Sequence, residues 1–169
     1  MAAYPPGSGL ANFEWRVSMA EVRAHGAFSI FPDIDRSLAV LEGSLRLLIA
    51  DRPPTTLSPE TPPVHFPGDV AASARPLGGV VTDLNVMVRR GRWRARMSLS
   101  AVERFAMPAG QGSALLIALT PLTMRSGAGA EQLARLDAAL LEAPAACEVQ
   151  RATAAGALWL IELTSCTQP

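Results

Sequence analysis

The sequence predicts an all-β protein built from many short strands joined by turns. Fourteen Pro and thirteen Gly residues are spread along the 169-residue chain and cut it into short apolar runs, which is typical of strands and turns. Several runs alternate between apolar and polar residues, the period of a strand with one covered face. Hydrophobic residues make up 49% and charged residues 18% of the chain, so it can bury a core and disorder is excluded.

Alternation is clearest in two segments. Residues 15–22 place Trp15, Val17 and Met19 on one face. Residues 92–99 place three arginines on one face and apolar side chains, ending with Leu99, on the other, as in a half-buried antiparallel strand. Further strands are predicted at residues 36–41, 45–49, 64–66, 80–89, 113–119 and 158–163. A proline-rich loop with at most a short strand is predicted at 55–63, and a tight turn at Pro67-Gly68-Asp69.

One segment departs from the strand pattern. Residues 131–142 place Leu133, Leu136, Leu140 and Leu141 at helical spacing in an Ala-rich and Leu-rich context. Local propensity therefore predicts a short helix of about three turns. Tertiary contacts would instead produce a strand, a turn around Asp137, and a second strand.

Charge and residue usage exclude several function classes. All fifteen basic residues are Arg and fifteen acids balance them, which argues against a broad nucleic-acid surface and against lysine chemistry. No apolar stretch reaches the ~20 residues of a membrane helix, and no signal peptide is visible. Cys147 and Cys166 are predicted to be free thiols of a cytoplasmic protein, with one disulfide as the alternative. His25 and His65 have no metal-binding spacing, so we expect no metal and no cofactor.

The segment from Arg89 to Arg96 is the most strongly charged part of the chain, with five arginines and Trp93. It is typical either of an anion or partner surface, or of a solvated strand face paired with neighbouring acids. The alternation and the zero net charge favour the second interpretation.

A second segment carries polar residues at strand spacing. In Asp83-Leu-Asn85-Val-Met87-Val-Arg89, the aspartate and the asparagine share one face. Arg16 and Ser18 offer a similar face. These side chains either meet solvent or line an internal pocket, where an Arg fork suits a small carboxylate.

Several motifs in order resemble the HutD/Ves family, and the resemblance covers about residues 13–97. The motifs are Trp15-Arg-Val-Ser-Met-Ala-Glu-Val22, Phe28-Ser-Ile-Phe-Pro-Asp-Ile-Asp-Arg36, Leu38-Ala-Val-Leu-Glu-Gly43, Phe66-Pro-Gly-Asp69 and Asp83-Leu-Asn-Val-Met87, followed by Arg89-Arg-Gly91.

This resemblance implies a cupin-like double β-barrel, or bicupin, with lobes at 1–107 and 108–169 that share one core. The Pro67-Gly68 turn and Asn85 look like remnants of a second cupin motif, whereas the metal-binding His and Glu of cupins have no match. The family is linked to bacterial histidine utilisation. It is thought to moderate that pathway by binding an acidic intermediate such as urocanate or formylglutamate, or formate.

The family's motif positions on this chain give the expected ligand-binding set, and no catalytic residue comes with them. These positions are Arg16, Ser18, Ser29, Asp35, Arg36, Asp83 and Asn85. The glycine-rich opening of the family, Trp-x-Asn-Gly-Gly-Gly-x-Thr, does not precede Pro5 here, so the chain either begins at a misplaced start or is a reduced member. In a reduced member, part of the ligand site would be missing, and an open strand edge would favour a homodimer or strand swapping.

Three functions follow from these expectations. The first is a metal-free module that binds a small carboxylate metabolite and regulates histidine breakdown, with no nucleic-acid or membrane partner. The second is an enzyme on the same metabolites, with Asp83, Asp35 or His65 as general base. The third is a protein-interaction module that uses the arginines between Arg89 and Arg96.

Overall fold

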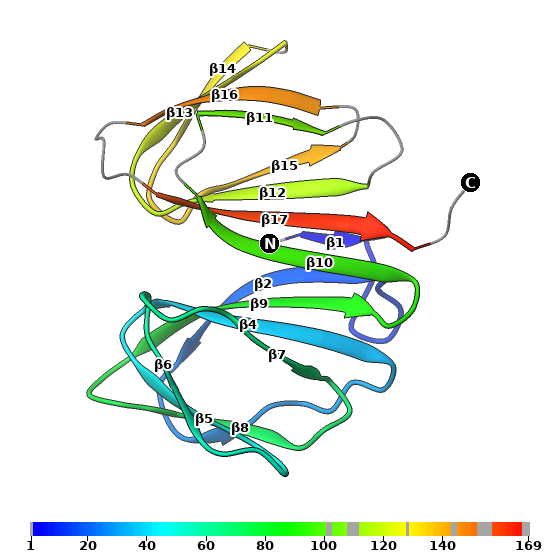
Figure 1. The fold of residues 1–169 in the computed structure, drawn as a ribbon, viewed down its shortest axis with the longest axis vertical. Coiled ribbons are helices and arrows are strands. Elements are labelled where there is room, and N and C mark those ends of the chain that lie inside the picture. The colour runs from blue at the N-terminus through cyan, green and yellow to red at the C-terminus, as the bar shows by residue number, and fades with distance from the viewer. Residues whose placement is uncertain are drawn as a thin grey trace. The chain divides into compact units, whose positions relative to one another are not determined.

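The computed structural model describes residues 2–100, 103–107, 112–127, 129–142, 145–151 and 157–166. Every regular element in these ranges is a β-strand (Figure 1), so the all-β prediction is confirmed. The described part of the chain holds no helix of the length and hydropathy that a bilayer crossing requires. The chain divides into two units, Met1–Trp93 and Arg94–Pro169.

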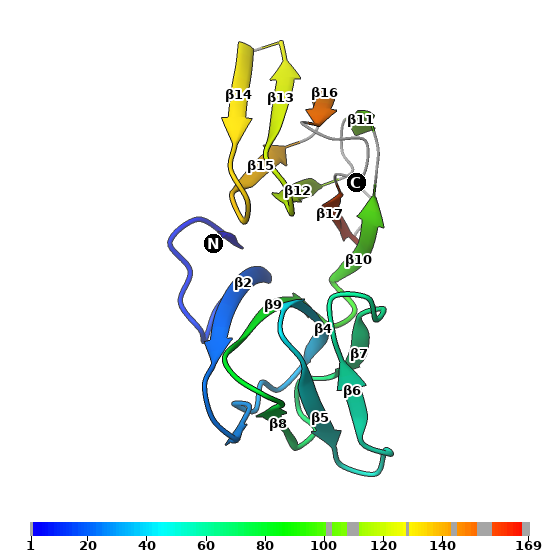
Figure 2. The same ribbon diagram turned by 90° about the vertical axis from the view of Figure 1, so that its left-hand side faces the viewer.

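The first unit consists of two antiparallel sheets, whose strands other than β3 are labelled in Figures 1 and 2. Sheet A has the order β1-β2-β9-β4-β7, with bounds Ala2–Tyr4, Trp15–Val22, Val81–Arg89, Ile34–Glu42 and Val64–Pro67. Sheet B has the order β3-β8-β5-β6, with bounds Gly26–Ala27, Ala72–Pro76, Leu45–Ile49 and Thr55–Leu57. The short β1 pairs with the first three residues of β2.

The core of the first unit lies between sheets A and B. Leu38 and Val40 of β4 pack against Leu45, Leu47 and other apolar side chains of sheet B. Burying each such side chain stabilises the fold by roughly 1.5–3 kcal/mol. Because side chains alternate along a strand, Arg36 faces the same interior as Leu38 and Val40.

The second unit also has two four-stranded sheets. Sheet C has the order β10-β17-β12-β15, with bounds Trp93–Ser100, Leu158–Ser165, Ser113–Ala118 and Ala138–Glu142. Sheet D has the order β11-β16-β13-β14, with bounds Arg104–Met107, Ala145–Arg151, Leu122–Ser126 and Gly129–Leu133. Leu116, Leu160 and Val149 belong to the core between them.

The division between the units lies after Trp93, whereas the sequence placed it after residue 107. The difference comes from β10, which pairs with β17 at the C-terminal end of the described chain. This strand pairing ties residues 94–100 to the second unit.

The helix predicted over 131–142 is wrong, and the strand-turn-strand alternative is correct. Leu136 lies in the turn with φ of 69°. Its N–H donates to Ala118 O at 2.7 Å, and the Asp137 carboxylate accepts from Ala134 N at 2.9 Å. These contacts outweigh the helical propensity of the Leu and Ala residues, because propensity is a weak preference beside tertiary hydrogen bonds.

The alternation predicted for residues 92–99 holds only through Met97. Arg92, Arg94 and Arg96 are exposed, and Trp93, Ala95 and Met97 are half-buried. Leu99, which the pattern placed on the covered face, is 53% exposed.

Both cysteines are free thiols, as the sequence predicted. Cys147 is buried in the core of the second unit, and burial raises the pKa of its thiol. Cys166 is exposed.

Candidate functional site

Three strands of sheet A bring the polar residues of the predicted site onto one face. The central strand, β9, pairs with β2 on one side and with β4 on the other. In one cross-strand row Arg16 and Arg36 flank Met87, and in the next Ser18 and Leu38 flank Asn85. A third row places Asp83 between Ala20 and Val40. Because directly paired residues project to the same side of a sheet, these polar side chains share the interior face of Leu38 and Val40.

Arg36 lies deep in this interior, with only 4% of the residue exposed. Its guanidinium carbon is 4.6 Å from the ring centre of Phe28, 5.4 Å from that of Phe66 and 5.9 Å from that of Phe31. A cation over aromatic faces is attracted by the ring quadrupole, more strongly when water is excluded. The three rings therefore hold the guanidinium in place and shield it from solvent.

The polar contacts of Arg36 are incomplete. Its Nη1 donates to the backbone carbonyl of Ser29 at 3.3 Å. Its Nε is buried and has no hydrogen-bond partner among the described residues. Burial lowers the pKa of the guanidinium and the charge of Asp83 raises it. An arginine keeps its proton throughout the physiological range, so the interior holds a fixed positive charge.

Asp83 is the acidic counterpart, with 2% of the residue exposed. Burial raises the pKa of its carboxyl group to about 6, against the opposing effects of the Ala20 backbone hydrogen bond and of the Arg36 charge. Desolvation of the charged form is thus the dominant effect. The Oδ1 atom is buried without a hydrogen-bond partner in the described chain.

Asn85 adds a third unpaired polar atom, because its Oδ1 is also buried without a partner among the residues described. Native proteins pair the great majority of their buried polar atoms, and leaving one unpaired costs roughly 1–3 kcal/mol. The interior thus presents one free donor, on Arg36, and two free acceptors, on Asp83 and Asn85. A ligand with an acceptor at one end and a donor at the other would complement them.

The remaining predicted residues are placed differently. Arg16 and Ser18 are half-buried on the same face as Arg36. Ser29 is exposed and reaches Arg36 only through its backbone carbonyl. Asp35 points to the opposite face of β4, where its carboxylate accepts from Arg90 Nε at 2.8 Å. The structure therefore does not bring Asp35 together with Arg36.

Arg90 fastens the Pro67-Gly68-Asp69 turn to β4. It binds both carboxylate oxygens of Asp69, at 3.0 and 3.1 Å, and it also donates to the carbonyl of Ile34 at 3.1 Å. Gly68 N donates to Ile34 O at 2.7 Å, and Phe31 N donates to Gly68 O at 2.8 Å. This turn, predicted from the sequence, thus positions one of the rings around Arg36.

The ring residues are the part of the site that sequence reasoning missed. Phe28 and Phe31 come from the loop before β4, and Phe66 comes from β7, where it pairs directly with Arg36. The only signal in the sequence is the number of aromatic residues in the segments around Arg36. The pairing of β4 with β7 is what brings Phe66 to Arg36.

Four of the five arginines from Arg89 to Arg96 have a partner in the described structure, and Arg94 is the exception. Arg92 bridges to Glu14 at 3.0 Å and Arg96 to Glu162 at 3.8 Å. Arg89 donates to the carbonyl of Phe13 at 3.2 Å. This arrangement agrees with the interpretation of a solvated strand face paired with neighbouring acids.

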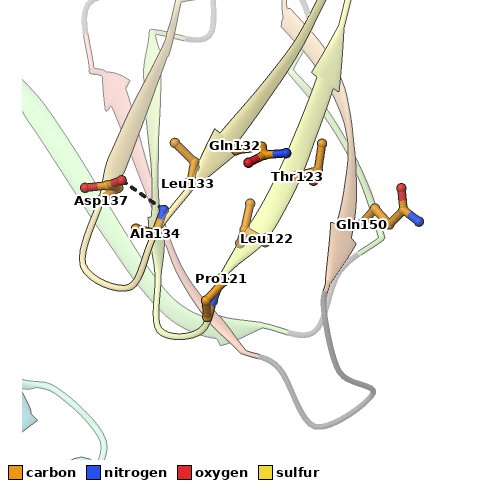
Figure 3. Close-up of a pocket in the computed structure, with 8 residues that line it drawn as sticks. All are labelled: Pro121, Leu122, Thr123, Gln132, Leu133, Ala134, Asp137 and Gln150. Carbon is orange, nitrogen blue, oxygen red and sulfur yellow. Dashed lines mark hydrogen bonds between the residues drawn. The ribbon is translucent and has the colours of Figure 1, made fainter.

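The second unit has a shallow hollow of about 510 Å³ that involves β13, β14 and β16. Figure 3 shows its lining: Pro121, Leu122, Thr123, Gln132, Leu133, Ala134, Asp137 and Gln150. The Asp137 carboxylate in it accepts the turn hydrogen bond from Ala134 (Figure 3). None of these eight residues is basic, so the hollow lacks the charge that a carboxylate ligand requires.

The strand order and the polar interior define a class, the cupin-like β proteins. The solved structure of a cupin 2 conserved barrel domain protein from Leptotrichia buccalis has the same fold, with a TM-score of 0.60 at 10% identity, covering 90% of this chain and 84% of that one.

A family profile described as HutD matches residues 1–159. The chain belongs to the HutD family, as the motifs predicted.

Three relatives illustrate the membership. The "Uncharacterized 21.2 kDa protein in hutC 3'region" of Pseudomonas putida is 37% identical over 92 residues, 54% of this chain and 48% of that protein. Protein Ves of Citrobacter koseri is 32% identical over 101 residues, 59% of this chain and 52% of that protein. The chain thus spans about half the length of the curated relatives it matches. The structure of HutD from Pseudomonas fluorescens SBW25, described as a formate condition, superposes with a TM-score of 0.77 at 27% identity, covering 95% of this chain and 84% of that one.

Proposed function

We propose that the protein binds a small carboxylate metabolite in the interior of its first unit. The observation that carries the proposal is the buried Arg36, whose Nε has no partner among the described residues. The Ser29 carbonyl and three phenylalanine rings already hold the guanidinium. Its remaining donor edge suits the two oxygens of a carboxylate, which a guanidinium fork binds in a shared plane.

The two free acceptors specify the rest of the ligand. The Oδ1 atoms of Asp83 and Asn85 require donors, so the ligand carries an N–H or O–H group away from its carboxylate. Urocanate has a ring N–H and formylglutamate an amide N–H, and both carry a carboxylate. Formate carries only the carboxylate and would engage the Arg36 end alone. We therefore expect formate to bind more weakly than the other two.

The proposed role of this binding is to regulate histidine breakdown. Membership of the HutD family supports the role, and so does the name of the Pseudomonas putida relative, which places that protein in a hutC 3' region. A regulator of this kind would act in the cytoplasm, where the metabolites occur, and it would need no metal, nucleic acid or membrane. A homodimer remains a prediction from the sequence.

A thermal-shift titration with urocanate, formylglutamate, formate and histidine tests the proposal. A ligand at ~100 times its dissociation constant should add about 2.7 kcal/mol to the free energy of unfolding. For a chain of this length that raises the Tm by roughly 5–10 °C. Arg36→Met should abolish the shift, because Met keeps apolar contact with the three rings but has no donor.

Ser29→Ala is the matched control, since only the backbone carbonyl of Ser29 touches Arg36. This variant should bind like the wild type. An Arg36→Met protein that melts cooperatively and still shows the full ligand shift would contradict the proposal, as would a wild type that responds to none of the four compounds.

The raised pKa of Asp83 favours a second candidate function, an enzyme on the same metabolites. A carboxyl group that titrates at about 6 suits a general base near neutral pH. Incubation of the wild type and of Asp83→Asn with the same four compounds, followed by mass spectrometry, tests this function. A product formed by the wild type alone would support it, and no product from either protein would reject it.

A further inference from the structure

The outer face of sheet B carries two arginines directly opposite each other. Arg46 of β5 pairs with Arg75 of β8 in the antiparallel register. Like charges at directly opposed positions destabilise a sheet. Neither guanidinium forms an ion pair or hydrogen bond with any residue that the structure describes, whereas Arg23, Arg90 and Arg92 of the same unit each pair with a carboxylate. The fold thus maintains two adjacent, uncompensated positive charges.

The two arginines line a hollow of about 560 Å³ in the surface of the first unit. The exposed His25 lies in the same lining, together with Ala24, Leu48 and Pro76, and none of these lining residues is acidic. Leu48 is 39% exposed and supplies an apolar surface beside the charges. A volume of this size is typical of sites for small molecules.

This hollow is separate from the interior around Arg36. Arg46 lies between Leu45 and Leu47, which both belong to the core between the sheets. Since successive side chains of a strand point to opposite faces, Arg46 points away from that core. The hollow and the interior can therefore be tested independently, because each has its own arginines.

We propose that the hollow binds the phosphate group of a small phosphorylated metabolite. A monocarboxylate has one charge and two oxygens, which satisfy one guanidinium fork. A phosphate monoester carries about −1.5 to −2 charges near pH 7 and three acceptor oxygens. It therefore balances both arginines at once and leaves an oxygen for an N–H of His25. The carbon part of the ligand lies against Leu48 and Pro76.

Calorimetric titration with phenyl phosphate, at constant ionic strength, tests this proposal. The wild type should bind, and Arg46→Gln and Arg75→Gln should each weaken binding at least tenfold. Arg94→Gln is the matched control, because it removes one exposed arginine from outside the hollow and should change the affinity less than twofold. Arg36→Met should also retain binding, which separates this hollow from the interior. The two hollow variants should melt no lower than the wild type, because each removes a repulsion.

Two further probes identify the chemistry. Inorganic phosphate should bind more weakly than phenyl phosphate, and equal affinity would overturn the placement of the carbon part against Leu48 and Pro76. Succinate has two charges but no phosphate, and binding as tight as that of phenyl phosphate would overturn the phosphate assignment. Absence of binding by the wild type, or wild-type affinity in both hollow variants, would overturn the site itself.

Discussion

Arg36 and Arg90 both lie in the first unit, in or beside β4, and they differ in their burial and in their hydrogen-bond partners. Arg90 is partly exposed and bonded to Asp35, Asp69 and a backbone carbonyl. Arg36 is buried among aromatic rings, with one backbone partner and an unpaired Nε. An arginine whose three guanidinium nitrogens are each bonded to the protein acts as a clamp. A buried arginine with a free donor is available to a ligand.

The contrast also shows how one strand serves two purposes. Asp35 and Arg36 are adjacent in β4 and point to opposite faces. Asp35 helps Arg90 hold the turn at Gly68, and this turn binds the backbone of Phe31, one of the rings around Arg36. The clamp therefore supports the binding group without touching it.

The largest expected effect comes from Asp83, the charged neighbour of Arg36 in the interior. Its pKa of about 6 lies above the ordinary 3.8, so between these pH values the folded protein binds more protons than the unfolded chain. The free energy of unfolding therefore falls as pH rises through this window. Over the whole window, the titration of Asp83 changes the free energy of unfolding by as much as about 3 kcal/mol. Asp83→Asn removes this change.

Urea denaturation at pH values from 4 to 7 measures this effect. The stability of Asp83→Asn should rise relative to the wild type across the window. Asp33→Asn, which alters an exposed aspartate, serves as the control and should follow the wild type. If the free energies of unfolding of Asp83→Asn and of the wild type change in parallel with pH, the raised pKa of Asp83 is contradicted.

A smaller effect is expected from Gly68, in the turn that connects the clamp to the rings. A Cβ at this position would lie 3.0 Å from the carbonyl oxygens of both Ile34 and Phe31. Backbone atoms cannot move aside cheaply, so Gly68→Ala should destabilise the protein by about 1–3 kcal/mol. It should also weaken ligand binding, because Phe31 would shift. Gly26→Ala is the control, because the added atom has open space around it. Urea denaturation measures the free energy of unfolding of both variants. Equal stability of the two would exclude the turn as a support for the site.

The smallest effect is expected from the clamp itself. Arg90 and its two carboxylates are partly exposed, and exposed ion pairs contribute little and are screened by salt. Arg90→Gln should lower the Tm by a few degrees in dilute buffer and by less in 1 M salt. The affinity of the Arg90→Gln variant for the interior ligand should stay within about twofold of the wild-type affinity. A loss of binding as severe as that of Arg36→Met would remove the distinction between the two arginines.

Alternation of apolar and polar residues was sufficient to predict the strands around the site. Residues 15–22 and 45–49 were placed at the bounds that β2 and β5 have. The strand predicted at 36–41 left Asp35 outside it, whereas β4 begins at Ile34, so Asp35 and Arg36 are successive residues of one strand and point to opposite faces. The helix at 131–142 was wrong because hydrogen bonds from Ala118 to the turn are not visible in local propensity.

The sequence could not predict the rings around Arg36 or the pair of Arg46 with Arg75, for a different reason. Phe28 and Phe31 come from the loop before β4, whereas Phe66 and the two arginines depend on the register between strands that are distant in the sequence, β4 with β7 and β5 with β8. A shift of one residue would turn each of these side chains to the other face. Composition and spacing do not specify such a register.

The central claim is that the Nε of Arg36 is the group that receives the ligand. The most direct test follows the Nε–H resonances of the arginines by NMR while urocanate is added, with Arg36→Met and Arg90→Gln used to assign the two signals. The Arg36 resonance should move on saturation, because its unpaired donor gains an acceptor. The Arg90 resonance should stay in place, because its Nε is already bonded to Asp35. Saturable binding that leaves the Arg36 resonance unmoved would contradict the claim.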